Sequence, residues 1–276
     1  MSVGRAIRRA WAREDWAEAA NLANQHPVTW VWRTVLFGPP GPHHRPAVWD
    51  FILARQSLGT PAQRYQRLAR AIIEDNLTVA RWLIARGVNP HEGVPRRSEL
   101  RLLQVAARWG RPHWLTELAS WGIHAHAPQV VHPGEAHLVS PISLTLSLTP
   151  FTSRLAMLRA LLDAGAPADE NLPVRDPRSM IADGNALHRL IDHLASGAYP
   201  GAWAITHALP AWEMLVAAGA SETRPNRHGH GALERLAFVA PAMAAAVHHR
   251  RQSQARATVL TQAVGPATIT RQRHRA

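Results

Sequence analysis

The chain has 276 residues and a formal net charge of +12, from 31 basic and 19 acidic residues. Its apolar fraction of 46% is ordinary for a folded domain and excludes a wholly disordered protein. Because the sequence contains no Cys, disulfides, thiolate metal sites and a cysteine nucleophile are excluded as well.

The first 60 residues are expected to form an N-terminal helical cap and a divergent first helix pair. Residues 5–22 have the apolar spacing of one amphipathic helix, with Trp11 and Trp16 on its buried side. Segments 30–36 and 47–58 would form the first pair, separated by a loop rich in glycine and proline. The basic start is a poor signal peptide, and no apolar run of about 18 residues predicts a membrane span.

Residues 61–249 contain a recurring helix ending. An apolar stripe at helical spacing is followed by a glycine just after the last turn, at Gly87, Gly122, Gly165 and Gly219. Glycine at that place accepts the left-handed conformation that closes a helix. Four such endings, each followed by a loop and another amphipathic segment, indicate a repeated unit.

Helix beginnings recur more loosely. Ser140-Pro141-Ile142-Ser143 places proline in a first helical turn. Residues 183–188 (Asp-Gly-Asn-Ala-Leu-His) form a similar turn, and residues 226–234 keep the spacing with other side chains. An Ala106-Ala107 pair followed by Gly110 precedes another of the helix endings.

These segments, clearest over about residues 65–240, resemble ankyrin repeats, whose pattern is D-G-x-T-P-L-H-x-A-A-x-x-G followed by L-L-x-x-G-A. The resemblance implies an all-α, ankyrin-like solenoid of about five to six stacked helix pairs with an N-terminal capping helix. Glycine spacings of 35, 43 and 54 residues between the four endings are irregular, so we expect long loops at 123–139, 166–183 and 195–210.

Tryptophan is frequent, with 11 residues against 4 Phe and 2 Tyr. It recurs in the expected second helices, at Trp49, Trp82, Trp114 and Trp212. Since each indole buries a large area, we predict that these four form the core between helix pairs. A binding hot spot is the alternative for tryptophans near turns.

Motifs for chemistry are few. His124-x-His126 and His228-x-His230 bring histidines together in loops, but no spacing matches a zinc site, and we predict neither metal nor cofactor. The resemblance implies that His188 makes structural hydrogen bonds in its turn. No phosphate-binding glycine loop, G-x-S-x-G or H-E-x-x-H occurs, so we expect no enzyme activity. A cryptic site between the N-terminal segment and the repeats is the remaining alternative.

The predicted contact face follows from the resemblance, which implies that loop tips and first helices form a concave surface. Its loops carry more basic than acidic side chains, which favours an acidic protein partner. A merely solvated basic surface is the alternative. The predicted partner-binding residues are Arg96, Arg97, Trp109, Trp121, His124, His126, Arg175, Arg178, Arg224, Arg227, His228 and His230.

The expected function is a non-catalytic protein–protein interaction scaffold: an adaptor, an inhibitor or immunity factor, or an effector. All 31 basic residues are Arg, which indicates a GC-rich bacterial genome or selection against lysine in a protein delivered to a host cell. We expect a cytoplasmic protein, or such an effector. The alternative function is nucleic-acid binding through the Arg-rich surface and a flexible basic tail at 250–276, although that tail lacks interleaved aromatic residues.

Overall fold

A computed structural model describes residues 3–25, 36–37, 45–53, 57–91, 101–125, 140–148, 151–169, 184–195, 201–226 and 228–264. Throughout these ranges the regular secondary structure is α-helical and no strand occurs, which confirms the all-α class. Within the same ranges, no helix combines the length and the hydropathy needed to span a bilayer.

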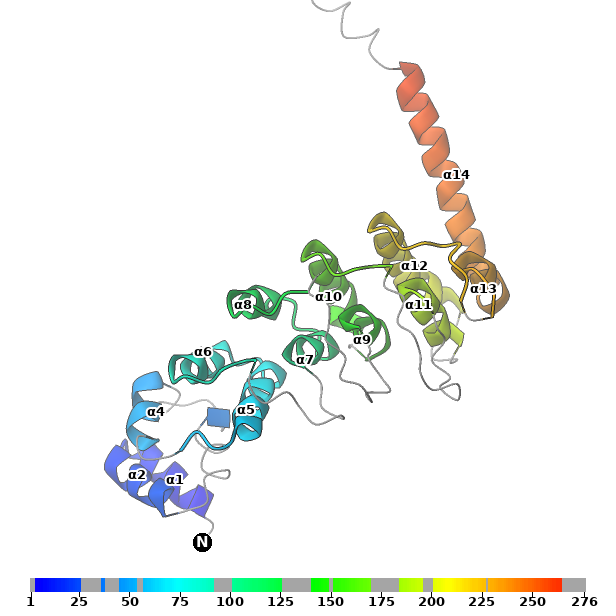
Figure 1. Cartoon of the computed structure of the whole chain (residues 1–276). Coiled ribbons are helices and arrows are strands. Elements are labelled where there is room, and N and C mark those ends of the chain that lie inside the picture. The colour runs from blue at the N-terminus through cyan, green and yellow to red at the C-terminus, as the bar shows by residue number, and fades with distance from the viewer. Residues whose placement is uncertain are drawn as a thin grey trace, which may run out of the picture. The chain divides into compact units, whose positions relative to one another are not determined.

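The chain divides into two compact units, Met1–Ala127 and Pro128–Ala276. The helices of the first unit are α1 (Val3–Ala12), α2 (Trp16–Asn24), α4 (Pro46–Ile52), α5 (Pro61–Ile73), α6 (Leu77–Ala85), α7 (Leu102–Arg108) and α8 (Trp114–Ser120) (Figure 1). Helix α5 packs against α6 and α7, and α7 packs against α8. Helix α4 packs against both α2 and α6.

The second unit contains α9 (Pro141–Leu148), α10 (Phe151–Asp163), α11 (Ala186–Ala195), α12 (Gly201–Ala217), α13 (Ala232–Val239) and α14 (Pro241–Val264). Consecutive helices pair as α9 with α10, α11 with α12, and α13 with α14. Helices α9, α11 and α13 also contact one another in that order, as do α10, α12 and α14. The three pairs therefore lie side by side in two rows.

The N-terminal segment differs from the single helix expected over residues 5–22. Glu14 takes a left-handed backbone conformation with φ of 56°, which ends α1 and reverses the chain. Asp15 then caps α2 by accepting a hydrogen bond of 2.9 Å from the backbone N–H of Glu18. The signal was the Asp-x-x-Glu spacing typical of a helix start.

Helix starts in the repeated region follow local capping chemistry. Thr60 and Gln63 form a reciprocal capping box at α5, with Pro61 in the first turn. Asn76 caps α6, and the Ser140 hydroxyl accepts from the backbone of Ser143 at α9. These caps satisfy backbone donors that have no partner inside the helix.

The four predicted helix-ending glycines all adopt left-handed conformations. Their φ values are 83° at Gly87, 80° at Gly122, 81° at Gly165 and 92° at Gly219. In each case the following N–H donates back to a carbonyl five residues earlier, at 2.9–3.1 Å. At Gly87 and Gly219 an added Cβ would meet no atom within 4 Å, so the preference for glycine there arises from backbone strain.

The predicted tryptophan core is confirmed. Trp49, Trp114 and Trp212 are at most 1% exposed, and Trp82 is 5% exposed. Trp49 and Trp82 meet edge to face with ring centroids 5.7 Å apart. Three of the four indole N–H groups donate to carboxylates at 2.8–2.9 Å. Trp82 donates to Asp50, Trp114 to Asp75 and Trp212 to Glu222.

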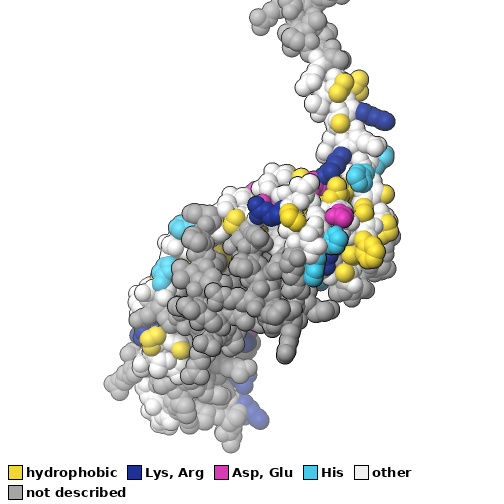
Figure 2. Space-filling model, turned by 45° about the vertical axis from the view of Figure 1, so that its right-hand side comes forward, with side chains coloured by type: hydrophobic (Ala, Val, Ile, Leu, Met, Phe, Trp, Pro, Cys, Tyr) yellow, Lys and Arg dark blue, Asp and Glu magenta, His cyan; other side chains and the backbone are white. Residues whose placement is uncertain are grey.

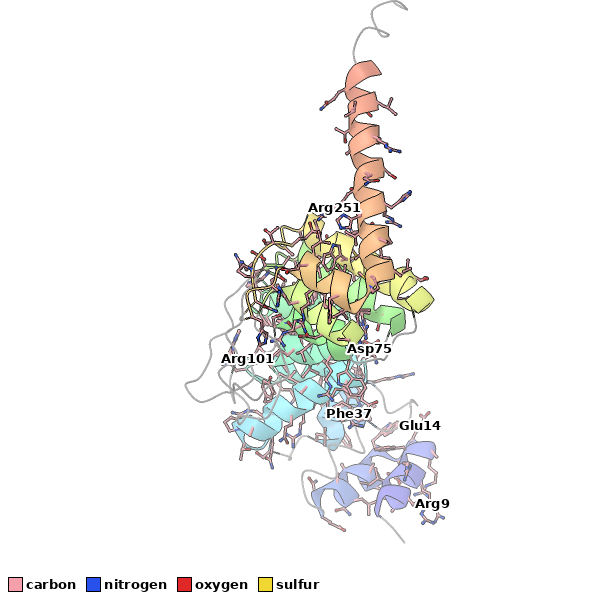
Figure 3. All side chains as sticks on the ribbon, turned by 90° about the vertical axis from the view of Figure 1, so that its right-hand side faces the viewer. Arg9, Glu14, Phe37, Asp75, Arg101 and Arg251 are labelled. Atoms are coloured by element: carbon pink, nitrogen blue, oxygen red, sulfur yellow. The ribbon has the colours of Figure 1, made fainter. Side chains whose placement is uncertain are left out.

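The segment expected to be a flexible tail begins inside α14. Arg250 pairs with Glu213 of α12, and Arg251 pairs with Glu222 in the loop after α12. Figure 3 places Arg251 in the lower part of α14, close to the rest of the unit. The last part of the predicted tail, 265–276, lies outside the described residues.

Candidate interaction surface

The turn between α5 and α6 is built around Asp75, labelled in Figure 3. Asp75 has a left-handed backbone with φ of 58°, and its carboxylate points to the turn between α7 and α8. Its Oδ1 accepts from the Trp114 indole at 2.8 Å and lies 2.6 Å from His113 Nε2. Arg111 donates to Oδ2 at 3.1 Å and to the carbonyl of Ile73 at 3.1 Å. One carboxylate thus joins two helix pairs.

Opposing influences act on the pKa of Asp75. Burial raises it, but the hydrogen bond from Trp114, the charge of Arg111 and the contact with His113 together outweigh burial. The pKa is therefore lowered, and Asp75 is ionised at neutral pH. A carboxylate with its acceptor positions filled in this way is a structural link rather than an acid or base for catalysis.

The predicted aromatic contacts of the first unit lie at two different edges. Trp109, 43% exposed, follows α7 directly, whereas Trp121 and His124 follow α8. A five-residue connection joins α7 to α8, so the two helices run antiparallel. The seven residues of α8 separate these edges by about 10 Å. Trp109 therefore belongs to the turn edge and the other two residues to the loop edge.

The loop edge of the first unit is itself tied together. His91, in the loop after α6, places Nε2 2.8 Å from the carbonyl of Trp121, in the loop after α8. The Trp121 ring packs against Trp114 with centroids 6.4 Å apart and an interplanar angle of 76°. Trp121 is half-buried by these contacts, and His124 is exposed beside it.

A polar cluster joins three loops of the second unit. Asp169 accepts from the Asn185 amide at 2.7 Å and from the backbone N–H of Ser221 at 2.9 Å. Arg224 pairs with the Asp169 carboxylate at 2.7 Å and donates to its carbonyl at 2.7 Å. These residues come from the loop after α10, the start of α11 and the loop after α12. Arg224, predicted to bind a partner, therefore organises the loop edge, with its side chain 40% exposed.

His188 lies beneath this cluster and is completely buried. Its Nδ1 is 3.0 Å from the Asn185 side-chain oxygen, and its Nε2 is 3.2 Å from the carbonyl of His230. A neutral imidazole carries one N–H, so it donates to one of these two oxygens at a time. The buried ring between the two oxygens agrees with the predicted structural role. Burial is the main cause that lowers its pKa, although the hydrogen bond to His230 opposes the shift. Gly184, with φ of 146°, makes room for the ring, which would lie 2.6 Å from an added Cβ.

The loop before α13 presents two of the predicted histidines. The buried side chain of Asn226 accepts from the backbone N–H groups of His228 and His230, at 2.9 and 3.2 Å. Both imidazoles are exposed, and His230 lies 3.3 Å from Glu234. Within the described residues, no group of three or more His, Asp or Glu is arranged to hold a metal ion.

The remaining predicted contacts are not described by the structure. They are Arg96, Arg97, His126, Arg175, Arg178 and Arg227. Sequence reasoning missed Asp75, Asp169 and Asn185, which organise the turns. A signal was present for Asp75. It lies 35 residues before Gly110, and its place in the turn between α5 and α6 is equivalent to that of Gly110 in the turn between α7 and α8.

No protein-family model matches the chain, and no curated protein is found to be similar to it. The candidate surface therefore has to be judged on its own geometry. Each unit has a loop edge of its own held by short polar contacts: that of the first unit presents Trp121 and His124, and that of the second presents His228 and His230. Aromatic and imidazole groups on a held backbone suit recognition of another protein.

Proposed function

We propose that the chain is a non-catalytic protein-interaction scaffold of the ankyrin type, in which stacked helix pairs hold a loop edge for binding. The observation that carries the proposal is a set of polar contacts that link one helix pair to the next. Three contacts of the first unit, Arg86–Asp50, Arg81–Glu117 and Arg111–Asp75, each join residues 36 apart.

The second unit has contacts of the same period. Asn185 donates to the carbonyl of Ser221, 36 residues away, and Arg250 donates to Glu213, 37 residues away. Contacts near 36 residues apart are expected when one helix pair is stacked on the next, whereas Arg224 and Asp169, also in contact, are 55 residues apart. The buried tryptophans and the four glycine endings support the same arrangement, because each feature recurs in several of the helix pairs.

The proposed binding residues lie on the loop edge of each unit: Trp121 and His124 in the first, and His228 and His230 in the second. A role for the loop arginines outside the described residues stays a prediction from the sequence. A basic excess would attract an acidic partner and increase its rate of association. Trp109 lies on the opposite edge and has no part in this face. The absence of Cys is compatible with a reducing compartment such as the cytoplasm.

Nucleic-acid binding has less support. Two arginines of the Arg-rich segment, Arg250 and Arg251, are already paired with Glu213 and Glu222. Their charges are therefore partly neutralised before any phosphate is met. A nuclease-sensitive complex would nevertheless favour this alternative and is an outcome of the experiment below.

The test compares the native chain with a variant in which His124, His228 and His230 are changed to Glu. We expect both to fold, because all three side chains are exposed. Binding partners are captured from the source organism, identified by mass spectrometry and then assayed as purified proteins. The proposal expects an acidic partner whose affinity is lost in the variant and weakened by salt.

A matched control changes His248 and His249 to Glu, which alters charge at exposed positions on helix α14 rather than in a loop. This control should keep the partner. Equal loss in both variants would indicate a general charge effect, and retention in both would contradict the proposed face.

A further inference from the structure

The last helix pair, α13 and α14, exposes unusually large apolar side chains. Phe238 is 91% exposed, Val259 63% and Leu260 65%, and the described residues otherwise expose large apolar groups at Phe51 and Trp109. Figure 2 shows hydrophobic side chains gathered at the foot of α14, with histidines beside them. Large apolar side chains this exposed often mark a surface that contacts another molecule.

The two halves of α14 differ in their support. Met243, Ala244 and Val247 are buried, and Arg250 and Arg251 are ion-paired to the rest of the unit. From residue 252 to residue 262 every side chain is exposed. A helical segment this short is marginal in water by itself, and Thr258 and Val259 have low helix propensity. The outer half therefore needs a surface to pack against.

Charges on this pair are placed to match a second copy. Glu234 precedes Phe238 by four residues on α13, and Arg256 precedes Leu260 by four residues on α14. If α13 of one copy lies alongside the outer half of α14 of another, Phe238 meets Leu260 and Glu234 meets Arg256. Two-fold symmetry repeats both contacts, since in such an interface each surface is used twice.

We propose that the chain forms a symmetric dimer through α13 and the outer half of α14. The net charge of +12 would oppose self-association over most of the surface. Residues 252–264 nevertheless contain Arg256 as their single charged residue, so this segment can approach a second copy with little repulsion. The dimer goes beyond the scaffold function and does not depend on it, since either could fail without the other.

Sedimentation velocity of the full chain over a range of concentrations tests the dimer. We expect a monomer–dimer equilibrium that Phe238→Ser shifts strongly to monomer and that Phe51→Ser, a matched exposed position in the first unit, leaves unchanged. Glu234→Arg and Arg256→Glu should each weaken the dimer by about tenfold or more, because like charges then face each other. The double variant should recover most of the affinity. Circular dichroism checks that every variant is folded.

Cysteine cross-linking tests the arrangement itself, because the chain has no Cys of its own. A chain carrying Phe238→Cys is mixed with one carrying Leu260→Cys under oxidised glutathione. We expect disulfide-linked heterodimers from this mixture, and few from a mixture of Phe51→Cys with Leu260→Cys. Monomer at every soluble concentration would overturn the proposal. A dimer that neither reverts in the charge-swap variant nor cross-links at these positions would overturn it equally, because another surface would then be responsible.

Discussion

The Asp75 cluster of the first unit and the His188 cluster of the second unit both link neighbouring helix pairs, but they use different chemical groups. Each joins one helix pair to the next through side chains far apart in the sequence. Asp75 is a charged carboxylate with its side chain 33% exposed, whereas His188 is a fully buried imidazole. The comparison shows that the link depends on filled hydrogen-bond positions rather than on a particular charge.

The two clusters should respond differently to acid. A histidine in the unfolded chain has a pKa near 6.5. Burial and the charge of Arg154 lower the pKa of His193 to about 4. The pKa of His188 is also lowered, chiefly by burial. The unfolded chain therefore binds more protons as pH falls below about 6.5, and stability falls with it. Asp75 has an ordinary pKa of 3.8 that is lowered in the fold, so its contribution is lost only below about pH 4.

The largest effect is expected for His188→Ala. The change leaves a cavity and removes the ring that lies between Asn185 and the His230 carbonyl, so the free energy of unfolding should fall by about 3 kcal/mol. Thermal unfolding followed by far-UV circular dichroism measures the loss. His228→Ala, at an exposed position on the same loop edge, should change stability by less than about 0.5 kcal/mol. Equal effects would mean that the buried ring is not the link.

Asp75→Ala should have the next largest effect, about 2 kcal/mol, because the buried indole N–H of Trp114 loses its acceptor. Tryptophan fluorescence during urea unfolding reports it, since Trp203 and Trp212 alone among the 11 tryptophans lie in the second unit. Asp75→Asn keeps an acceptor and should lose less. Glu14→Ala is the control, because Glu14 has a similar left-handed backbone but belongs to no such cluster. A comparable loss of stability in Glu14→Ala would mean that the backbone conformation, and not the cluster, causes the loss in Asp75→Ala.

The pH dependence should separate the two units. Between pH 7 and pH 5 the second unit should lose stability, by about 1–2 kcal/mol, because protonation favours the unfolded histidines. The first unit should keep its Asp75 link until the pH falls below about 4. Circular dichroism and tryptophan fluorescence, recorded together at each pH, would then give different midpoints. His193→Gln should flatten the response seen by circular dichroism, and an unchanged response would exclude that residue as a cause.

The smallest effects concern backbone strain, and they should be alike in the two units. Gly87→Ala and Gly219→Ala each place a Cβ in open space at positive φ, so each should cost about 1 kcal/mol. Glu14→Gly makes the reverse change and should raise stability by somewhat less than 1 kcal/mol. Chemical denaturation measures all three. A gain on replacing either glycine would show that the left-handed ending is not maintained.

Some local features of the fold could be predicted, but the loop expected over 195–210 is wrong, because α12 begins at Gly201, and the helix expected over 47–58 ends at Ile52. The glycine endings at Gly87 and Gly219 depend on backbone sterics, and the burial of Trp82 and Trp114 depends on apolar spacing along one helix. The division of the N-terminal segment at Glu14 was missed: the left-handed glutamate itself leaves no mark, and the only local signal is the Asp15-x-x-Glu18 helix start after it. The predicted contact residues do not all lie on one edge, since Trp109 lies at a different edge of the first unit from Trp121.

By itself, then, the amino-acid sequence determined the four glycine helix endings and which tryptophans are buried, because glycine conformation and helical spacing act over a few residues. The tertiary structure decided which polar groups satisfy one another. Asp75 acquires its role only when Arg111, 36 residues later, lies against it, and Arg224 becomes a loop organiser only beside Asp169. Such pairings depend on how the helix pairs pack, which no local pattern contains.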